Sequence, residues 1–386
     1  MSLQTARYET LAKDAAIQPV AMVTAMAERD GSNEGGLTLS REQIITINKY
    51  ANYVFGLPKT RQTIEHWLGY KVIDEPELAP SAMFSLFNRL RNHANSWTTL
   101  SDRSKRLSSE LASTANLIDV VGEEIVEECN RLRFLSREMT WEQVALAKPV
   151  KLGTEDQKVV KTLVEYLKII GDDVRNYAER VGGVKKDSEV FRDIVKKELL
   201  PAVGNKDNAL KRKEGDGLVE QLRAELKALD TEIDELKKEY DKYLTNGLTS
   251  LAGNVLSAIV AGTIYGVKAE RVRKQRKSVE RQRREVAAKL KARVSLEGRL
   301  KEMTQFVDDL NVRLSDVLTS ASHLQTVWDH VDVYINKSVE ELGSITDGQR
   351  LAIFLIYFKR FLKQWKEIER TSLQLTAVFD NAASAR

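Results

Sequence analysis

The 386-residue chain is 30% charged and has only six prolines, a composition that favours long helices and allows a sizeable core. Its net charge of +4 hides a local asymmetry, because residues 268–293 hold twelve Lys or Arg residues against three Glu. Cys129 is the only cysteine, which excludes an intrachain disulfide, and few stretches show the alternating apolar and polar pattern of strands.

Residues 1–38 form a weakly patterned lead-in that ends in ERDGSNEGG, a sequence typical of a loop or a mobile tether. The lead-in has no basic n-region followed by a continuous apolar h-region, so we expect no cleavable secretory signal peptide. If the protein leaves its cell, it does so by a route that needs no cleavable signal peptide.

The first clearly predicted helix begins after Ser40, which forms a capping box with Gln43. Leu39 and Ile44 supply a hydrophobic staple, and the helix should end near Gly56. A short helix over 60–68 should follow.

A proline-bounded loop then leads to Pro80. From Ser81 the spacing of apolar residues indicates a long helix with one narrow apolar seam. The seam residues are Leu107, Leu111, Thr114, Ile118, Val121, Ile125, Leu132 and Leu135.

A capping box over 154–157 starts the next predicted helix, which should end near Val181. Gly182 and Gly183 should separate it from a helical piece that ends at Pro201. Near the C-terminus, 346–349 should cap the last helix.

The run Leu351–Phe358 in this last helix is too wide for a two-stranded seam, so we expect it at the centre of a multi-helix bundle.

Two helical arms with unbroken heptad seams flank an uncharged segment. The first seam is Leu222, Leu226, Leu229, Ile233, Leu236, Tyr240 and Tyr243. The second is Leu296, Leu300, Met303, Val307, Leu310, Leu314, Val317, Ala321, Leu324, Trp328, Val331 and Ile335. From Val267 to about Leu342 the second arm is expected to be one helix roughly 110 Å long, too long for a compact globule.

The segment between the arms, Tyr243–Val267, has 25 residues and no charge. If it crossed a bilayer once, the arms would lie on opposite sides and could not pair. A hairpin keeps them together, with legs of roughly 15 to 18 Å and a turn at Gly253-Asn254. Such legs enter one leaflet but do not span a hydrocarbon core of about 30 Å.

These considerations give three sets of candidate residues. The predicted membrane-inserting residues are Leu248, Leu251, Val255, Leu256, Ile259, Val260, Ile264 and Val267. The predicted interfacial and headgroup-contacting residues are Tyr243, Tyr265, Lys268, Arg271, Arg273 and Lys274, because aromatic rings and cations favour that depth. Gly247 and Gly266 are the predicted hinges.

The expected domains are a lead-in over 1–38, a helical bundle or tail over 39–217 and 296–386, and a coiled-coil stalk over 218–295 with an apolar tip at 243–267. The fold class is therefore all-α, an elongated multi-helix bundle with a long antiparallel coiled-coil hairpin.

Long helical seams, the tip GLTSLAGNVLSAIVAGTIYGV and the basic continuation KAERVRKQRK together resemble the cytolysin A-like alpha pore-forming toxins. Within that family the chain looks most like the A component of the binary xenorhabdolysin-type toxins, from about Ser40 onward. The resemblance implies a soluble, secreted component that meets a target-cell membrane and co-assembles with a second, B-type subunit into a hetero-oligomeric ring.

Other functions have weaker support in the sequence. No phosphate-binding loop or HExxH motif is present, and the four histidines are scattered, so we expect no enzyme, cofactor or metal site. The basic block followed by heptads superficially resembles a basic-zipper region, but residues 268–293 contain no asparagine to pair with adenine, so no nucleic-acid partner is expected. The alternative is a non-toxic coiled-coil tether or scaffold whose apolar tip docks on a protein, and the basic block could also be only a solvated helix face.

Overall fold

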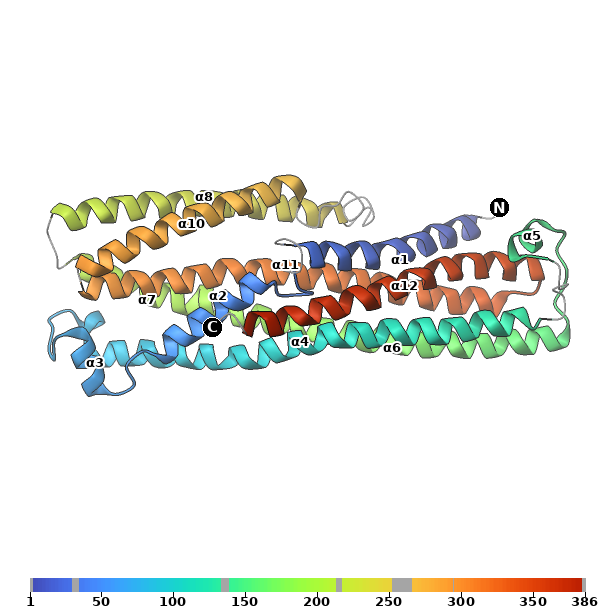
Figure 1. The fold of residues 1–386 in the computed structure, drawn as a ribbon, viewed down its shortest axis with the longest axis horizontal. Helices are drawn as coiled ribbons and strands as arrows, with labels where there is room; N and C mark the ends of the chain where they lie inside the picture. Colours follow the sequence, from blue (N-terminus) through green and yellow to red (C-terminus); the bar gives the residue numbers. More distant parts are fainter. Residues whose placement is uncertain are drawn as a thin grey trace.

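The computed structural model describes residues 3–29, 35–132, 139–212, 217–251, 266–293 and 295–383. These residues form helices and short connections, and no strand occurs among them, which confirms the all-α prediction. Long helices run side by side along one axis and give the molecule an elongated shape (Figure 1).

The helices of the N-terminal half are α1 (Leu3–Glu28), α2 (Arg41–Phe55), α3 (Arg61–Leu68), the 3-10 turn η1 (Pro76–Leu78), α4 (Pro80–Asn130) and α5 (Trp141–Leu146). They are followed by α6 (Thr154–Ile194), the π-helical turn η2 (Val195–Leu199), α7 (Leu200–Lys211) and α8 (Gly217–Leu251). The C-terminal helices are α10 (Gly266–Arg293), α11 (Ser295–Ser344) and α12 (Gly348–Ala383).

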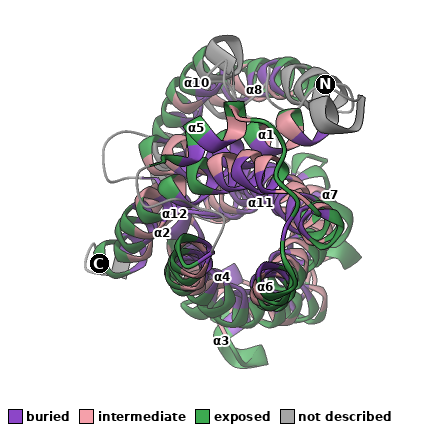
Figure 2. Cartoon of the chain, turned by 90° about the vertical axis from the view of Figure 1, so that its right-hand side faces the viewer, coloured by how far each residue is buried: buried purple, intermediate pink, exposed green. Residues whose placement is uncertain are grey.

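The body of the protein is built from α4, α6, α11 and α12, with α1 and α2 packed on it. Helix α11 packs on α6, α12 packs on α4, and α1 lies against α12 and α11. Viewed along the long axis, the buried residues of these helices face one another and the exposed residues face outward (Figure 2). Each helix therefore contributes one apolar stripe to a shared core.

The predicted seams lie in this core. Every seam residue of α11 is buried except Leu296, which is half-buried. On α4 the seam is buried apart from the half-buried Val121, and Leu135 lies outside the described residues. The apolar run of α12 is the expected bundle centre, where Phe354 and Phe358 are fully enclosed.

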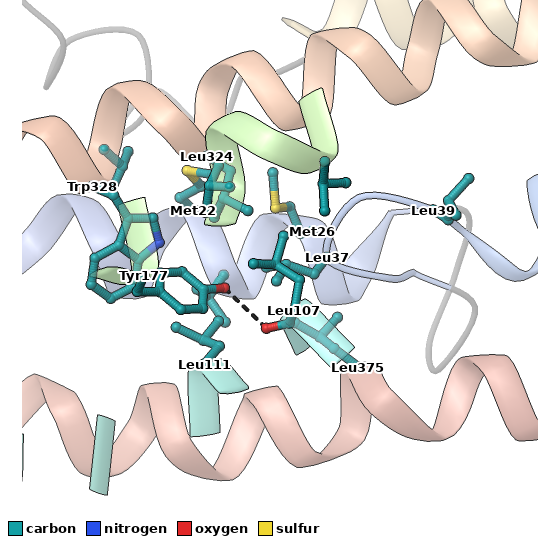
Figure 3. Close-up of a cluster of buried hydrophobic side chains, with 14 of the residues drawn as sticks. Met22, Met26, Leu37, Leu39, Leu107, Leu111, Tyr177, Leu324, Trp328 and Leu375 are labelled. Atoms are coloured by element: carbon teal, nitrogen blue, oxygen red, sulfur yellow. Dashed lines mark hydrogen bonds between the residues drawn. The ribbon is translucent and has the colours of Figure 1, made fainter. Parts of the chain in front are cut away.

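A cluster at the middle of the body joins five helices (Figure 3). The ring of Tyr177 on α6 is tilted by 60° to that of Trp328 on α11 with 4.6 Å between the ring centroids, and Trp328 in turn lies 5.3 Å from Trp365 of α12. The Tyr177 hydroxyl donates a 3.2 Å hydrogen bond to the carbonyl oxygen of Leu107 on α4. Met22 of α1 also points into this cluster.

Two local predictions are confirmed at α2. The Ser40 hydroxyl accepts from the Gln43 amide at 3.4 Å, and the Gln43 side chain accepts from the Ser40 amide at 2.8 Å. Leu39 and Ile44 are both buried, as a hydrophobic staple requires.

The lead-in is more ordered than its weak pattern suggested. Residues 3–28 form α1, which packs on α12 and α11. Its buried stripe includes Ala12, Ala15, Met22 and Met26, and alanines give little hydrophobic contrast in a sequence. The prediction missed this helix because small residues allow close packing without a strong apolar pattern.

The predicted separation at Gly182-Gly183 is wrong, because α6 continues through both glycines to Ile194. Packing of α6 against α4 and α11 outweighs the cost of about 1 kcal/mol that each glycine brings. The helix is instead distorted at η2, just before Pro201. Proline lacks an amide donor and its ring clashes with the preceding turn, which a wider π turn relieves.

Two predicted caps are displaced by one residue. Helix α6 begins at Thr154 with Gly153 as its N-cap, and the Asp156 carboxylate accepts from the Gly153 amide at 3.2 Å. In α12 the Asp347 carboxylate accepts from the Arg350 amide at 2.9 Å, so Asp347 caps this helix instead of Thr346. Short polar side chains at adjacent positions compete for the same role.

The Trp328 cluster gives a stability prediction. Because Trp328→Ala leaves a large cavity between α6, α11 and α12, we expect the free energy of unfolding to fall by about 3–5 kcal/mol. Leu146→Ala is the control, since that side chain is 88% exposed and should change stability by less than about 0.5 kcal/mol. Urea unfolding measures both, and equal losses in the two variants would contradict the packing described here.

Candidate functional site

Helices α8 and α10 form an antiparallel hairpin with its own small cores. One cluster joins Ile233, Leu236 and Tyr240 of α8 to Val272 and Val279 of α10. A second joins Leu226 of α8 to Val286 and Ala287 of α10, with Leu222 and Leu229 packed against it. The predicted seam of α8 therefore packs against α10, and these clusters are separate from the core of the body. The expected pairing of the two heptad arms is wrong, because the second seam lies in the body core.

The hairpin lies back along the body. Helix α10 packs on α11 as well as on α8, and Figure 1 shows the hairpin beside α11. The prediction of one continuous second arm is therefore wrong, since α10 and α11 are two helices that run antiparallel. The heptad pattern holds on both sides of residue 294, but such a pattern does not specify whether two successive helices are collinear or folded together.

The contact between α10 and the body is made by ion pairs. Arg276 lies 3.3 Å from Asp316, and Arg284 lies 3.3 Å from Asp309, both of these acids being on α11. In the opposite sense, Arg313 of α11 lies 3.1 Å from Glu280 of α10.

The register of these pairs follows from helix geometry. On α10 the residues 276, 280 and 284 are four apart and share one face, and on α11 their partners 316, 313 and 309 descend along one face. Helix α2 adds Glu42, which pairs with Lys277 and lies 2.9 Å from Arg313. Four carboxylates and four cations thus line one seam between the hairpin and the body.

Several of these charges are buried. The side chains of Arg276 and Asp316 are 2% and 3% exposed. A pocket of about 450 Å³ lies at the junction of α2, α10 and α11, and Ile45, Ala287 and Phe306 form the apolar part of its wall. Its charged and polar lining residues are Glu42, Thr46, Lys49, Arg284, Glu302, Gln305, Asp309 and Arg313.

The predicted headgroup cations occupy different environments. Arg271 and Lys274 are exposed on α10, whereas Arg273 is 4% exposed and cannot reach a membrane surface in this conformation. Arg283, on the side of α10 toward α8, pairs with Asp230. The side chains of Tyr243, Tyr265 and Lys268 lie outside the described residues.

The predicted inserting residues cannot be placed. Residues 252–265 lie outside the described part of the chain, and so do the side chains of Leu248, Leu251 and Val267. The expected turn at Gly253-Asn254 falls in the same gap. Of the predicted hinges, Gly247 is inside α8 and Gly266 is the first residue of α10.

The basic block has a second role that was not predicted from its sequence, which is to form ion pairs between α10 and the body. Its cations were predicted only as a solvated face or as headgroup contacts, and Glu280, Asp309 and Asp316 were not predicted to take part. The signal was present, because acidic residues recur along α11 at the spacing of the cations on α10. Only an antiparallel arrangement of the two helices makes that correspondence meaningful.

The described residues offer little for catalysis. They contain no group of three or more His, Cys, Asp or Glu side chains suited to a metal ion. Burial raises the pKa of the Cys129 thiol, and burial lowers the pKa of His323 to about 4. His323 is therefore an uncharged buried residue.

Within the described ranges, the structure contains no helix that combines the length and the apolar character needed to cross a bilayer.

Burial, followed by the like charge of Glu280, raises the pKa of Asp309 to about 6. The charged groups around this carboxyl are Glu280, Arg283 and Arg284 on α10, Glu302, Asp308 and Arg313 on α11, and Glu42 and Lys49 on α2. An exposed aspartate ionises near pH 4, so the docked hairpin takes up a proton at a higher pH than a released one. Acidification from pH 7 to pH 5 therefore favours the docked arrangement.

The expected stabilisation of the docked hairpin at low pH can be tested by amide hydrogen exchange in α10. After correction for intrinsic rates, α10 amides should be better protected at pH 5 than at pH 7.5. Asp309→Asn should remove most of the difference, because the amide does not titrate. A difference that persists unchanged in Asp309→Asn would assign the pH dependence to other groups.

No protein-family model matches the chain, and a comparison with curated proteins finds no match. Solved structures do share its fold. YaxA from Yersinia enterocolitica is 24% identical, with 89% of this chain and 98% of that chain covered at a TM-score of 0.50. A chain of the YaxAB pore complex is 23% identical, with 90% and 98% covered at a TM-score of 0.50.

Soluble SmhA, from the tripartite alpha-pore forming toxin of Serratia marcescens, is 12% identical and aligns over 95% of both chains at a TM-score of 0.53. The chain thus has the fold of alpha pore-forming toxin components along nearly its whole length, which confirms the structural resemblance predicted from the sequence.

Proposed function

We propose that this chain is a component of a binary alpha pore-forming cytolysin. It binds a target membrane through the α8/α10 hairpin and co-assembles with a second component into a ring-shaped pore. The observation that carries the proposal is the uncharged segment 243–267 between the two helices of an antiparallel hairpin, in a chain with the fold of such toxin components.

The neighbours support the two states that this function requires. SmhA was solved as a soluble protein, and YaxAB was solved as a pore complex. By analogy, the arrangement described here is the soluble state, with its hairpin docked on the body. The likeness to YaxA supports an A-type assignment, with a B-type subunit as partner.

The domain division expected from the sequence fits this proposal. Residues 218–295 act as a stalk that moves against the bundle of 39–217 and 296–386, and residues 1–38 pack on that bundle through α1. The stalk moves as one unit because α8 and α10 share their own apolar clusters. Gly247 and Gly266, which flank the tip, allow the tip to change its angle to the stalk.

The tip enters one leaflet through its apolar side chains, which are Leu248, Leu251, Val255, Leu256, Ile259, Val260, Ile264 and Val267. Tyr243, Tyr265, Lys268, Arg271, Arg273 and Lys274 then contact the interface and the headgroups. Legs of about 15 to 18 Å are short of a full crossing, so the partner completes the channel. The protein acts on the target-cell membrane without catalysis, and its partners are lipid and the second subunit.

The deciding experiment is release of a trapped dye from lipid vesicles by this protein alone and with proteins encoded beside its gene. We expect release only in the presence of a second component. If no combination releases dye and the protein does not float with vesicles, the tether or scaffold alternative replaces the toxin.

The tip itself can be tested by placing charges in it. Val255→Asp with Ile259→Asp should abolish flotation with vesicles, because two carboxylates in hydrocarbon cost several kcal/mol. Circular dichroism should remain that of the wild type. Leu373→Asp with Val120→Asp, at exposed apolar positions on the body, is the matched control and should still float. Unchanged flotation of the tip variant would exclude the tip as the membrane contact.

A further inference from the structure

The ion-pair seam raises the question of what displaces the hairpin from the body. Its cations on α10 that reach the body are Arg276, Lys277 and Arg284. Their partners are Asp316 and Asp309 of α11 and Glu42 of α2. Arg276 and Lys277 lie about 100° apart around α10, and Arg284, eight residues after Arg276, lies between them in angle, so the three cations occupy a sector of about 100°.

We propose that Arg276, Lys277 and Arg284 form a masked binding face for an anionic lipid surface, and that such a surface releases the hairpin by competing with Asp316, Glu42 and Asp309. The inference rests on the proposed function and adds to it the lipid class and the release step. It differs from the headgroup contacts assigned to Arg271 and Lys274, which are exposed without any movement.

The first argument is the nature of the contact. The hairpin is held together by apolar clusters of its own, and the body has a separate apolar core. Between them lies a seam of buried charges, with a pocket of mixed charged and apolar lining beside it. Burying paired charges removes their hydration, so such a contact gives little net stability and can open without disrupting either core.

The second argument is chemical. Guanidinium groups bind phosphate oxygens in the same planar geometry that they use for carboxylates. Phosphatidylserine headgroups can therefore replace Asp316 and Asp309 at Arg276 and Arg284. A leaflet presents many such groups at once, whereas the body presents one carboxylate per cation.

The third argument is position. The three cations follow the uncharged segment by roughly three to five helical turns. They meet a leaflet when the stalk lies along it, before the apolar tip has entered. Once α10 separates from α11, the two helices can become collinear, as the unbroken heptad pattern on both sides permits. The tip would then point away from the body.

A fourth argument comes from the charges of α2 and α11 that release of the hairpin uncovers. Release exposes the carboxylates of Asp316, Asp309, Glu42 and Glu302 together with the cations Arg313 and Lys49, so this face of α2 and α11 is net negative and is repelled by the same leaflet. An anionic surface thus attracts the hairpin and repels the face that held it. A neutral surface does neither.

The test follows the position of the hairpin directly. Dyes at Lys238→Cys on α8 and Lys161→Cys on α6 report their separation by energy transfer, since both positions are exposed and Cys129 is buried. In low salt, vesicles of phosphatidylcholine and phosphatidylserine in equal parts should lengthen the mean distance. Phosphatidylcholine alone should not, and high salt should suppress the change.

Two sets of variants test whether the ion-pair seam controls the distance between the dyes and the binding to vesicles. Asp316→Asn with Glu42→Gln weakens the seam from the body side and should lengthen the distance without lipid. Asp172→Asn with Glu165→Gln, which removes two exposed pairs on α6, is the matched control and should not. Lys277→Gln with Arg284→Gln should bind phosphatidylserine vesicles roughly 25-fold more weakly, because each cation near an anionic leaflet contributes about a factor of five.

The outcomes separate this inference from the proposed function. If anionic vesicles leave the distance unchanged while dye release with a second component still occurs, the competition is wrong and the toxin stands. If the distance lengthens but no combination releases dye, the masked lipid-binding face stands and the toxin is wrong. If a seam variant fails to fold, the proposal is decided by how the distance between the dyes in the wild type depends on salt and lipid. Equal changes in that distance with neutral and anionic vesicles overturn the proposal.

Discussion

Helix α11 has two faces of opposite character, and the arrangement of the molecule depends on them. One face is a continuous apolar seam from Leu300 to Ile335 that packs into the body against α6 and its neighbours. The other carries Asp309, Arg313 and Asp316 and receives α10. The same helix therefore packs into the bundle through one face and pairs with the hairpin through the other.

The difference between these two contacts is energetic. Apolar burial is favourable in proportion to the area removed from water, and a seam of ten or more enclosed side chains is very costly to open. A buried ion pair regains hydration when it opens, so its net contribution is small even though each pair is well formed. Charges join the hairpin to the body, while apolar contacts hold each of these two parts together.

This division also accounts for the unusual composition of α10. A helix with twelve basic residues in residues 266–293 is a poor candidate for burial, yet Arg273, Arg276 and Arg283 are enclosed. The burial of Arg276 is tolerated because it pairs with Glu280 of α10 and Asp316 of α11, and that of Arg283 because it pairs with Asp230 of α8. Burial, followed by the like charge of Glu280, raises the pKa of Asp309, so the charges at this contact are not fully compensated.

Much of the fold could be predicted from periodicity. The seams of α4, α8 and α11, the apolar run of α12 and the capping box at Ser40 all appear where the sequence placed them. The errors share a cause. Helix α1 uses small residues that give little contrast, and α6 passes through Gly182 because its neighbours stabilise it, so both depend on tertiary packing that local patterns do not contain.

For the candidate site, the sequence by itself determined that an uncharged segment separates two heptad arms and that a basic block follows it, because charge and spacing are local properties. Only the tertiary structure decided that α10 turns back on α11 and that Arg276 and Arg284 meet Asp316 and Asp309. A heptad repeat specifies which face of a helix is apolar. It does not specify the partner or the direction of approach, and these are set by the complementarity of charges far apart in the chain.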